Sequence, residues 1–474
     1  MFPAKIISSV IALLFLLSPS AAFSQIEFAP YQAFAAGSSS DAVCIGDLNN
    51  DGLNDVALGT GTYFDAANDF KISVFLQNNS GGLNPAVKYN YPQAYPGLTT
   101  LKIADLNGDS RNDIILGYNT KIGILYQNSA GTFNAIVEFN TGALVECLDT
   151  GDLNDDGMSD VAVSTEYASY FKVFYQIGGS LVAVSYPKPT NAKYIEVEIG
   201  DVNADGKDDI IFQKFGVTSG LHVYLQNEIT GFDIFTEYIV PNIDNYTTLL
   251  DGIGVGDLNH DGLEDVAASR SGNRPQSKII VWYQNQNTHA LDDVSVFPAY
   301  DIPNPVEIDD FNNDGENELI TVHGGWQKLS CYQQDNNNLL GNYTLYPSPG
   351  SSHYDYQALS LGDLNHDGKK DVAVADTWLG LLVYYNTTTL STADFNEEKT
   401  TIYPNPAGDF LTIKSSHSPF DQLKIYDMLG QCVLYVGKAN DTQTTINLGA
   451  LPVGLYTLKV YFGSQMVTQK LLKN

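Results

Sequence analysis

Residues 46–59 read GDLNNDGLNDVALG and contain a short acidic loop. Asp47, Asn49, Asp51 and Asp55 occupy loop positions 1, 3, 5 and 9, and Gly52 occupies position 6. Oxygen-bearing side chains on alternate residues of a tight turn can converge on one point, and the glycine supplies the backbone conformation that the turn needs. Three crowded carboxylates favour a bound cation, and Ca²⁺ takes six to eight oxygen ligands. The stretch therefore predicts a calcium-binding loop.

The same pattern recurs six more times, with first positions 47 to 58 residues apart. The residues at positions 1, 3, 5 and 9 of the six further loops are Asp105, Asn107, Asp109 and Asp113; Asp152, Asn154, Asp156 and Asp160; Asp201, Asn203, Asp205 and Asp209; Asp257, Asn259, Asp261 and Asp265; Asp310, Asn312, Asp314 and Glu318; and Asp363, Asn365, Asp367 and Asp371. Seven loops at a nearly regular period indicate a repeat architecture.

Position 12 of the loops excludes an EF-hand. An EF-hand loop ends in a bidentate Glu at that position and is flanked by helices. Here position 12 is Leu58, Leu116, Val163, Phe212, Ala268, Thr321 or Val374. The residues after position 9 are apolar and often β-branched, which predicts a strand directly after each loop.

Charge and composition limit the partners. The chain has 55 acidic and 24 basic residues, a formal net charge of -31, and the seven loops account for 21 of the acids. This balance argues against nucleic acid or an anionic membrane as a partner. The four cysteines, Cys44, Cys147, Cys331 and Cys432, form no dense disulfide framework. We expect them to be small buried hydrophobic residues, although the sequence leaves a pairing open.

The N-terminus predicts export. Residues 1–24 have a basic start at Lys5, an apolar run over residues 6–17 and the small residues Ala22 and Ser24, as in a secretory signal peptide. The run is too short to span a bilayer comfortably, and no other stretch is long and apolar enough. We therefore expect an exported chain with no transmembrane segment in its mature form.

Each repeat predicts four strands. In the first repeat we expect them at residues 42–46, 55–59, 72–76 and 86–89, and the Gln77-Asn78 pair that recurs after the third strand suggests turn chemistry. A four-stranded unit of about 50 residues suggests a β-propeller blade, so residues 25–386 predict an all-β, seven-bladed propeller. The seventh repeat lacks a fourth strand, and we expect residues 26–35 to supply it and so remove an exposed sheet edge.

The loops resemble the FG-GAP (VCBS-type) repeats of the integrin α-subunit propeller, over residues 26–386. The resemblance implies structural Ca²⁺, up to seven ions, held by the side chains at positions 1, 3, 5 and 9 and by the backbone carbonyl at position 7. The position 7 residues are Leu53, Arg111, Met158, Lys207, Leu263, Glu316 and Lys369. Two loops depart from the pattern: Ser110 replaces the glycine in the second, which predicts strain, and Glu318 replaces Asp in the sixth.

Residues 401–474 follow a polar linker at residues 387–400 and carry a second set of motifs. These are Tyr403-Pro-Asn-Pro406, Asp427-Met-Leu-Gly430 and Leu451-Pro-Val-Gly-Leu-Tyr456. They resemble the type A C-terminal sorting domain of type IX secretion cargo. The resemblance implies a small Ig-like β-sandwich read by the type IX secretion machinery, and a protein that is secreted or held at the outer-membrane surface.

The function that these features favour is a binding or adhesion module for a glycan or protein. Candidate ligand residues lie on loops expected opposite the calcium loops: Tyr63, Phe64, Tyr118, Tyr167, Tyr170, Trp326, Tyr354, Tyr356, Trp378, Arg270 and Arg274. A polysaccharide-degrading lyase or hydrolase is the alternative, and a matrix role is a third. No catalytic constellation stands out, because His260 and His366 occupy loop position 4, which we expect to face solvent.

Overall fold

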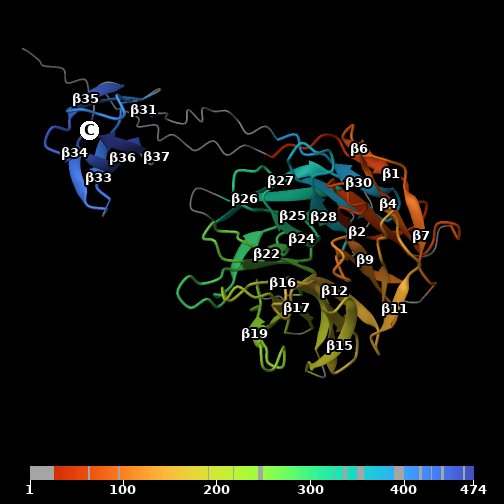
Figure 1. The fold of residues 1–474 in the computed structure, drawn as a ribbon. Helices are drawn as coiled ribbons and strands as arrows, with labels where there is room; N and C mark the ends of the chain where they lie inside the picture. Colours follow the sequence, from red (N-terminus) through yellow and green to blue (C-terminus); the bar gives the residue numbers. More distant parts are fainter. Residues whose placement is uncertain are drawn as a thin grey trace, which may run out of the picture. The chain divides into compact units, whose positions relative to one another are not determined.

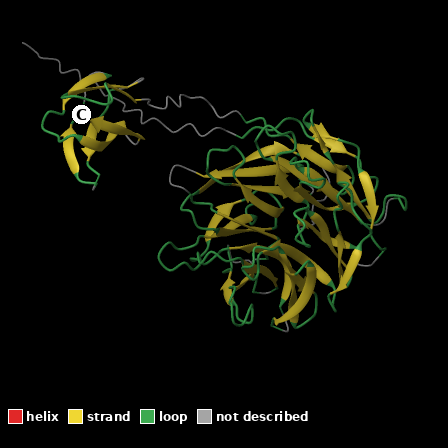
Figure 2. Cartoon of the chain, in the orientation of Figure 1, coloured by secondary structure: helices red, strands yellow, loops and turns green. Residues whose placement is uncertain are grey.

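The computed structural model describes residues 26–61, 65–93, 97–189, 192–216, 218–243, 249–324, 326–334, 339–349, 357–388, 400–415, 419–428, 430–438, 442–462 and 465–474. The predicted signal peptide lies outside these residues. The chain divides into two compact units, Met1–Leu390 and Ser391–Asn474, which are treated separately. Within the described residues every regular element is a β-strand (Figure 2). No described helix is long and apolar enough to cross a membrane.

The first unit contains seven four-stranded antiparallel sheets, which follow one another in chain order in Figure 1. The strands of sheets 1 to 3 are β2 (Ser40–Gly46), β3 (Asp55–Thr60), β4 (Lys71–Phe75) and β7 (Val87–Asn90); β8 (Leu98–Ala104), β9 (Asp113–Tyr118), β10 (Lys121–Leu125) and β11 (Val137–Asn140); and β12 (Val145–Gly151), β13 (Asp160–Thr165), β14 (Tyr170–Ile177) and β15 (Ser180–Pro187). A short hairpin of β5 (Gln77–Asn78) and β6 (Gly82–Leu83) follows β4.

Sheets 4 to 6 repeat this order. Their strands are β16 (Lys193–Gly200), β17 (Asp209–Phe215), β18 (Gly220–Tyr224) and β19 (Thr236–Ile239); β20 (Gly252–Gly256), β21 (Asp265–Arg270), β22 (Lys278–Trp282) and β23 (Ser295–Pro298); and β24 (Pro303–Asp309), β25 (Glu318–His323), β26 (Lys328–Gln334) and β27 (Leu340–Pro347). The strand that follows each acidic loop is apolar and buried along almost its whole length, as in DVALGT of β3. A strand reads this way when both faces of its sheet are covered.

Sheet 7 is completed by the N-terminus. It consists of β28 (Leu359–Gly362), β29 (Asp371–Asp376), β30 (Gly380–Tyr384) and, at its edge, β1 (Gln32–Phe34). β1 pairs antiparallel with β30, with Ala33 opposite Leu382. The joint continues outside the strands, where the Ala29 N–H donates to the carbonyl of Tyr385 at 2.9 Å. The predicted pairing of the N-terminal segment with the last repeat is therefore confirmed.

Each sheet packs against the next through one apolar cluster. Leu101 and Leu116 of sheet 2 join Leu48 and Ile72 of repeat 1, and each later pair of consecutive sheets shares a similar cluster. A further cluster contains residues of the seventh and the first repeat. The first strands follow the same order of contacts, including β28 with β2. This is an all-β, propeller-like repeat fold.

The second unit contains two sheets that share one apolar core. The first consists of β31 (Thr400–Tyr403), β32 (Phe410–Ser415) and β35 (Gln443–Asn447), and the second of β34 (Cys432–Val436), β33 (Gln422–Tyr426), β36 (Gly454–Phe462) and β37 (Gln465–Lys473). Leu411 and Ile413 from the first sheet meet Leu423 and Leu458 from the second in this core.

The cysteine prediction is partly wrong. All four cysteines are free thiols, and Cys147 and Cys331 are buried as expected. Cys44 is half-buried on β2, whereas Cys432 is exposed at the start of β34. Cys432 is the first residue of β34, which is an edge strand of its sheet, so few neighbouring residues cover its side chain. The apolar character of cysteine therefore did not decide whether Cys432 is buried.

Gly380 gives a direct test of the pairing between the N-terminal strand β1 and β30. It has φ +91°, and a Cβ at this position would overlap the backbone of Phe34 and Ala36 in the β1 segment. We expect Gly380→Ala to lower the free energy of unfolding by at least about 3 kcal/mol, because backbone strain and displacement of β1 add together. Gly178→Ala is the matched control: Gly178 has φ +58° and open space around it, so only about 1–2 kcal/mol of strain applies. Equal losses in denaturant unfolding of the two variants would show that β1 does not constrain this site.

Candidate metal loops

The seven acidic loops share one network of backbone hydrogen bonds. In every loop the position 1 carboxylate accepts the N–H groups of positions 5 and 6; in the first loop these are Asp51 N to Asp47 Oδ1 at 3.2 Å and Gly52 N to Asp47 Oδ2 at 2.8 Å. The corresponding position 6 bonds of the other loops measure 2.7 to 3.0 Å. The position 5 carboxylate accepts the N–H of position 7, as Asp51 Oδ1 does from Leu53 at 2.9 Å.

Two left-handed residues give each loop its shape. Position 4 has positive φ throughout: Asn50, Gly108, Asp155, Ala204, His260, Asn313 and His366. Position 6 also has positive φ, and Ser110 takes it at 64° where the other loops have glycine. The predicted strain of the second loop is thus present, yet Ser110 keeps the N–H bond to Asp105 at 2.7 Å. His260 and His366 are exposed, as expected for position 4.

The position 9 acid is the buried anchor of each loop. Asp55 is fully buried, and its Oδ2 accepts the Leu48 N–H at 2.9 Å while its Oδ1 accepts the Gln77 N–H at 2.7 Å. Burial raises the pKa of this acid to about 7 in repeats 1, 3, 4, 5 and 7, to about 6 in repeat 2 and to about 8 in repeat 6. A buried carboxylate with a raised pKa gains from a nearby cation.

The donor chemistry of the loops fits a hard cation. Each loop offers three carboxylates and an amide oxygen, and the described residues place no Lys or Arg in an ion pair with the ligand-position acids of repeats 1, 3, 4, 5 and 6. Asp209 Oδ2 is buried with no hydrogen-bond partner of normal geometry, although the Val202 N–H is near enough to lower its pKa. The carboxylates are turned onto the loop N–H groups, and no three His, Cys, Asp or Glu side chains in the described part of the chain are gathered as a metal site.

The second loop departs furthest from this donor set. The Arg111 guanidinium forms an ion pair with the position 5 acid, Asp109. Asn107 turns its Nδ2 toward Asp113 Oδ2 at 3.2 Å, so its amide nitrogen faces the position 9 acid.

In the sixth loop Asn312 Nδ2 likewise donates to Glu318 Oε1 at 2.9 Å, and the longer acid still accepts the Phe311 N–H at 2.9 Å.

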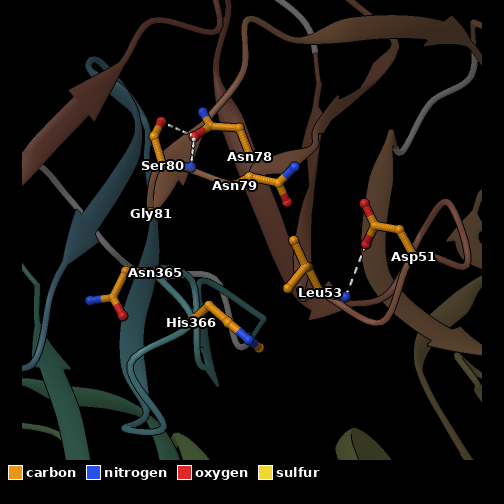
Figure 3. A pocket seen from close by; sticks show the side chains of 8 residues that line it. All are labelled: Asp51, Leu53, Asn78, Asn79, Ser80, Gly81, Asn365 and His366. Atoms are coloured by element: carbon orange, nitrogen blue, oxygen red, sulfur yellow. Dashed lines mark hydrogen bonds between the residues drawn. The ribbon is translucent and has the colours of Figure 1, made fainter.

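Two cavities are lined by residues of two consecutive acidic loops. One of about 570 Å³ lies between the seventh loop and the first (Figure 3). Asn365 and His366 line it from the seventh loop, Asp51 and Leu53 from the first, and the turn at residues 78–81 from the end of the third strand. A second cavity, of about 460 Å³, lies at the same place between the loops of repeats 3 and 4. At these two places residues of consecutive loops therefore line one cavity.

The glutamine after the third strand was misread from sequence as turn chemistry alone. Asn78 does close the turn, since its Oδ1 accepts the Ser80 N–H at 3.0 Å. Gln77, however, is 3 % exposed, and its Nε2 donates to the carbonyls of Asn54 at 3.0 Å and Asp363 at 2.9 Å. Its exact recurrence one residue before the turn was the available signal, but sequence alone does not show which loop a side chain reaches.

The residues proposed for the opposite face do not form one site. Tyr63, Phe64, Tyr354 and Tyr356 lie outside the described residues. Tyr118 and Arg270 are 1 % and 3 % exposed, so the prediction of ligand contact is wrong for both. Tyr118 OH donates to Glu138 at 2.7 Å, which holds it within sheet 2. Long side chains at the ends of second strands turn into the packing between sheets.

Three of the proposed aromatics are exposed. Tyr167 is 86 %, Trp378 65 % and Trp326 45 % exposed, each on the connection between the second and third strands of a different sheet. Tyr170 is half-buried, and its hydroxyl donates to the Thr141 carbonyl at 3.2 Å. Arg274 forms an ion pair with Asp301 at 3.0 Å and lies 4.3 Å from the Tyr300 ring centroid.

One cluster outside the loops combines titratable groups with a cavity. His222 is 2 % exposed, and its Nδ1 lies 2.6 Å from Tyr194 OH and its Nε2 3.3 Å from Glu237 Oε1. Burial lowers the pKa of His222, and Glu237 is also paired with Lys214. The adjoining cavity of about 330 Å³ is lined by Phe215 and Phe235 among others. Both imidazole nitrogens already have partners, so the cluster has the features of a structural network.

Charged groups also lie along the first strands. Lys102 Nζ is 3.0 Å from Asp149 and 3.8 Å from Glu198, on three successive sheets. Burial opposes a charge on Lys102, but Asp149 and Glu198 raise its pKa well above the usual value. Burial raises the pKa of Glu307 to about 7. One cation thus links acids of separate sheets.

The two roles of the loop acids can be separated by mutation. In chelator, we expect Asp55→Asn to lower the free energy of unfolding by about 2–3 kcal/mol, because an amide nitrogen would face one of the two buried N–H groups. Asp51→Asn is the matched control in the same loop: it is exposed and keeps an acceptor for the Leu53 N–H, so the change should stay within about 0.5 kcal/mol. Denaturant unfolding in EDTA measures both; similar losses would contradict the anchoring role of position 9.

His323 predicts an acid-sensitive component of stability. It is 1 % exposed, with Nδ1 2.9 Å from the Asp301 carbonyl and Nε2 paired with Ser330, and burial lowers its pKa to about 4. The unfolded chain, with a His pKa of about 6.5, therefore binds the proton first, and stability is lost as pH falls from about 6.5 to about 4, by up to about 3 kcal/mol. We expect His323→Gln to be less stable at pH 7 but to lose less on acidification. Parallel curves of unfolding free energy against pH would contradict this.

Solved structures similar to this chain were found by comparison of folds. A crystal structure of BBS1N in complex with ARL6DN, soaked with lead, matches with a TM-score of 0.51 and 13% identity, covering 78% of this chain and 98% of that chain, which supports the fold alone. The structure of an Agrocybe aegerita lectin that recognises non-reducing terminal N-acetylglucosamine matches with a TM-score of 0.49 and 15% identity, covering 67% of this chain and 83% of that chain. A search of curated proteins found no match.

Two family models match the sequence. Residues 401–474 match the secretion system C-terminal sorting domain, which indicates export to the cell surface or secretion and contact with the secretion machinery. The FG-GAP-like repeat matches at residues 47–116, 105–163, 152–212, 201–268 and 310–374, and these matches include all seven loops. The chain belongs to the FG-GAP-like repeat family and carries a secretion system C-terminal sorting domain.

Proposed function

We propose that the protein is an exported binding module built on a closed seven-bladed β-propeller that Ca²⁺ stabilises. The observation that carries the proposal is the recurrence of one hydrogen-bond network in seven acidic loops, with a buried acid at position 9 of each. The cluster that joins the seventh and first repeats supports closure of the ring. Residues 1–24 would be the signal peptide and residues 401–474 an Ig-like domain addressed to the type IX machinery.

The ions would be structural. Positions 1, 3, 5 and 9 and the carbonyl at position 7 would hold each ion, which neutralises carboxylates that otherwise repel one another. Extracellular calcium modules bind with Kd of about 10⁻⁴–10⁻³ M, and a tenfold excess of ion over Kd adds about 1.4 kcal/mol per site. Several such sites are comparable with the whole stability margin of a domain, about 5–15 kcal/mol. The second loop is the weakest candidate because Arg111 already pairs with Asp109.

A glycan or protein ligand would bind at the other end of the sheets. In an antiparallel sheet the first-to-second and second-to-third connections lie at opposite ends, so the metal loops occupy one face and Tyr167, Trp326 and Trp378 belong to the other. Exposed aromatic side chains stack on sugar rings and anchor protein interfaces at low entropic cost. The satisfied partners of His222 give no support to the enzymatic alternative, so binding is the function we advance.

The metal part of the proposal is tested by thermal unfolding of the full chain in EDTA, Mg²⁺ and Ca²⁺. We expect millimolar Ca²⁺ to raise Tm by several degrees and Mg²⁺ to have little effect, because Mg²⁺ requires near-ideal octahedral geometry and gives up its bound water reluctantly. Asp51→Asn should keep its stability in EDTA but lose about 1 kcal/mol of the calcium-dependent gain. An unchanged Tm in Ca²⁺ would refute structural calcium.

The binding part is tested by glycan and protein arrays probed with the full chain. We expect Trp326→Ala or Trp378→Ala to abolish any signal without changing Tm, because both side chains are substantially exposed. Val184→Ala is a control for loss of an exposed apolar side chain elsewhere, since Val184 is 37 % exposed on β15. A ligand signal that survives both tryptophan variants would refute the assignment of this face.

A further inference from the structure

An amide residue stands at the end of the third strand of each sheet and touches the loop of its own repeat. Its backbone N–H donates to the position 9 acid, at 2.7 to 2.9 Å, in six repeats. The six residues are Gln77, Gln127, Gln176, Gln226, Gln284 and Asn386. The main chain of this residue therefore helps to fix the buried acid of its own loop.

In three repeats the side chain of the same residue reaches the loop of the preceding repeat, whereas Gln127 Nε2 and Gln334 Nε2 donate to the carbonyls of Asn112 and Asn317 in their own loops. Gln226 Nε2 donates to the Asp152 carbonyl at 3.3 Å and Gln284 Nε2 to the Asp201 carbonyl at 3.2 Å. Gln77 Nε2 donates to the Asp363 carbonyl at 2.9 Å, which connects the first repeat to the seventh across the joint between the chain ends. The carbonyls reached belong to position 1 of the preceding loops.

The carbonyl oxygen of this side-chain amide has no hydrogen-bond donor in most of the described repeats. Among the described residues, the buried Oε1 atoms of Gln77, Gln127, Gln226, Gln284 and Gln334 accept no hydrogen bond. An unpaired buried carbonyl is costly, so a fivefold recurrence at one repeat position calls for an acceptor role. Gln176 shows the role: with its amide group turned, Oε1 accepts the N–H groups of Asn107 at 3.1 Å and Gly108 at 2.5 Å, which are positions 3 and 4 of the preceding loop.

The loops at present use their position 1 acid for those N–H groups. Asp47 Oδ1 accepts from Asn49 at 3.2 Å and from Asn50 at 2.6 Å, and Asp105 Oδ1 accepts from Asn107 at 3.2 Å and Gly108 at 2.7 Å. A position 1 oxygen that ligates a cation has less capacity for these donors. In the second loop a group that can replace it is the Gln176 amide of the following repeat, whose turned Oε1 accepts the same two N–H groups.

We propose that this amide is a positioning residue that couples neighbouring metal loops, so that cation binding in one loop favours binding in the next around the ring. The inference rests on the proposed calcium function and goes beyond it, since seven independent sites would satisfy that function equally well. Through Gln77, the state of the seventh loop reaches the buried Asp55 of the first loop, although the two loops are far apart in sequence. A residue with only a structural role would stabilise the fold equally in chelator and in calcium.

Hydrogen exchange of the full chain, read on peptides that cover residues 46–59 and 362–375, tests the coupling. Ca²⁺ is titrated into the wild type, Gln77→Met, Asp367→Asn and the double variant, and the concentration that gives half-maximal protection is measured for each loop. Asp367→Asn removes a position 5 acid of the seventh loop. We expect it to raise the half-maximal concentration at the first loop about fivefold or more in the wild-type background, and to have no effect there in the Gln77→Met background.

Two other outcomes separate the two proposals. No calcium-induced protection at any loop would refute the proposed calcium function itself. Protection at each loop with an unchanged first-loop midpoint in Asp367→Asn, or an equal shift with and without Gln77, would overturn the coupling while leaving calcium binding intact. Asn78→Ser is the matched control, because the hydrogen bonds of the Asn78 side chain among the described residues stay within its own hairpin, to Ser80 at 3.0 Å and Asn84 at 3.4 Å. If Gln77→Met fails to fold, Gln226→Met with Asp156→Asn tests loops 3 and 4 in the same way.

Discussion

The fold depends on one buried carboxylate per repeat. Asp55 accepts one N–H from the start of the loop and one from the end of the third strand, so a single side chain fixes the loop to its own sheet. Asp209 keeps the third-strand bond and Glu318 the loop bond. A buried acid is unfavourable unless its oxygens are hydrogen-bonded or near a cation. Both bonds recur in repeats 1, 2, 3, 5 and 7, so a group that would be unfavourable without partners fixes the loop geometry of these repeats.

Packing between sheets supplies the remaining order. Because the second strand of each sheet is buried on both faces, no sheet is stable without two neighbours. The N-terminal strand β1 meets this requirement for the last sheet, and a shared apolar cluster joins that sheet to the first. The pairing of β1 with β30 is therefore needed to complete the seventh sheet, since the edge of β30 would otherwise be exposed.

The regular features of this fold were predictable from sequence and the exceptions were not. The period of the loops and the apolar strand after each one predicted four strands per repeat and the role of residues 26–35, because local spacing and alternation decide them. The burial of Tyr118 and Arg270 was missed, since a side chain at the end of a strand can turn toward solvent or into the next sheet. The hydrogen bond from Gln77 to the Asp363 carbonyl was missed for a related reason: it joins residues of the first and seventh repeats that are far apart in sequence.

The two ends of the sheets differ in how their connections are held. The loops between first and second strands carry acids, left-handed residues and cross-repeat amide contacts, so a substitution there can affect the neighbouring repeat as well. The described hairpins between second and third strands present the exposed side chains of Tyr167, Trp326 and Trp378 on three different sheets. The loops between first and second strands stabilise the repeats, whereas the described loops at the other end of the sheets have no such shared role. Loops held by a rigid scaffold often carry binding residues, which is the physical reason to look for ligand recognition at that other end.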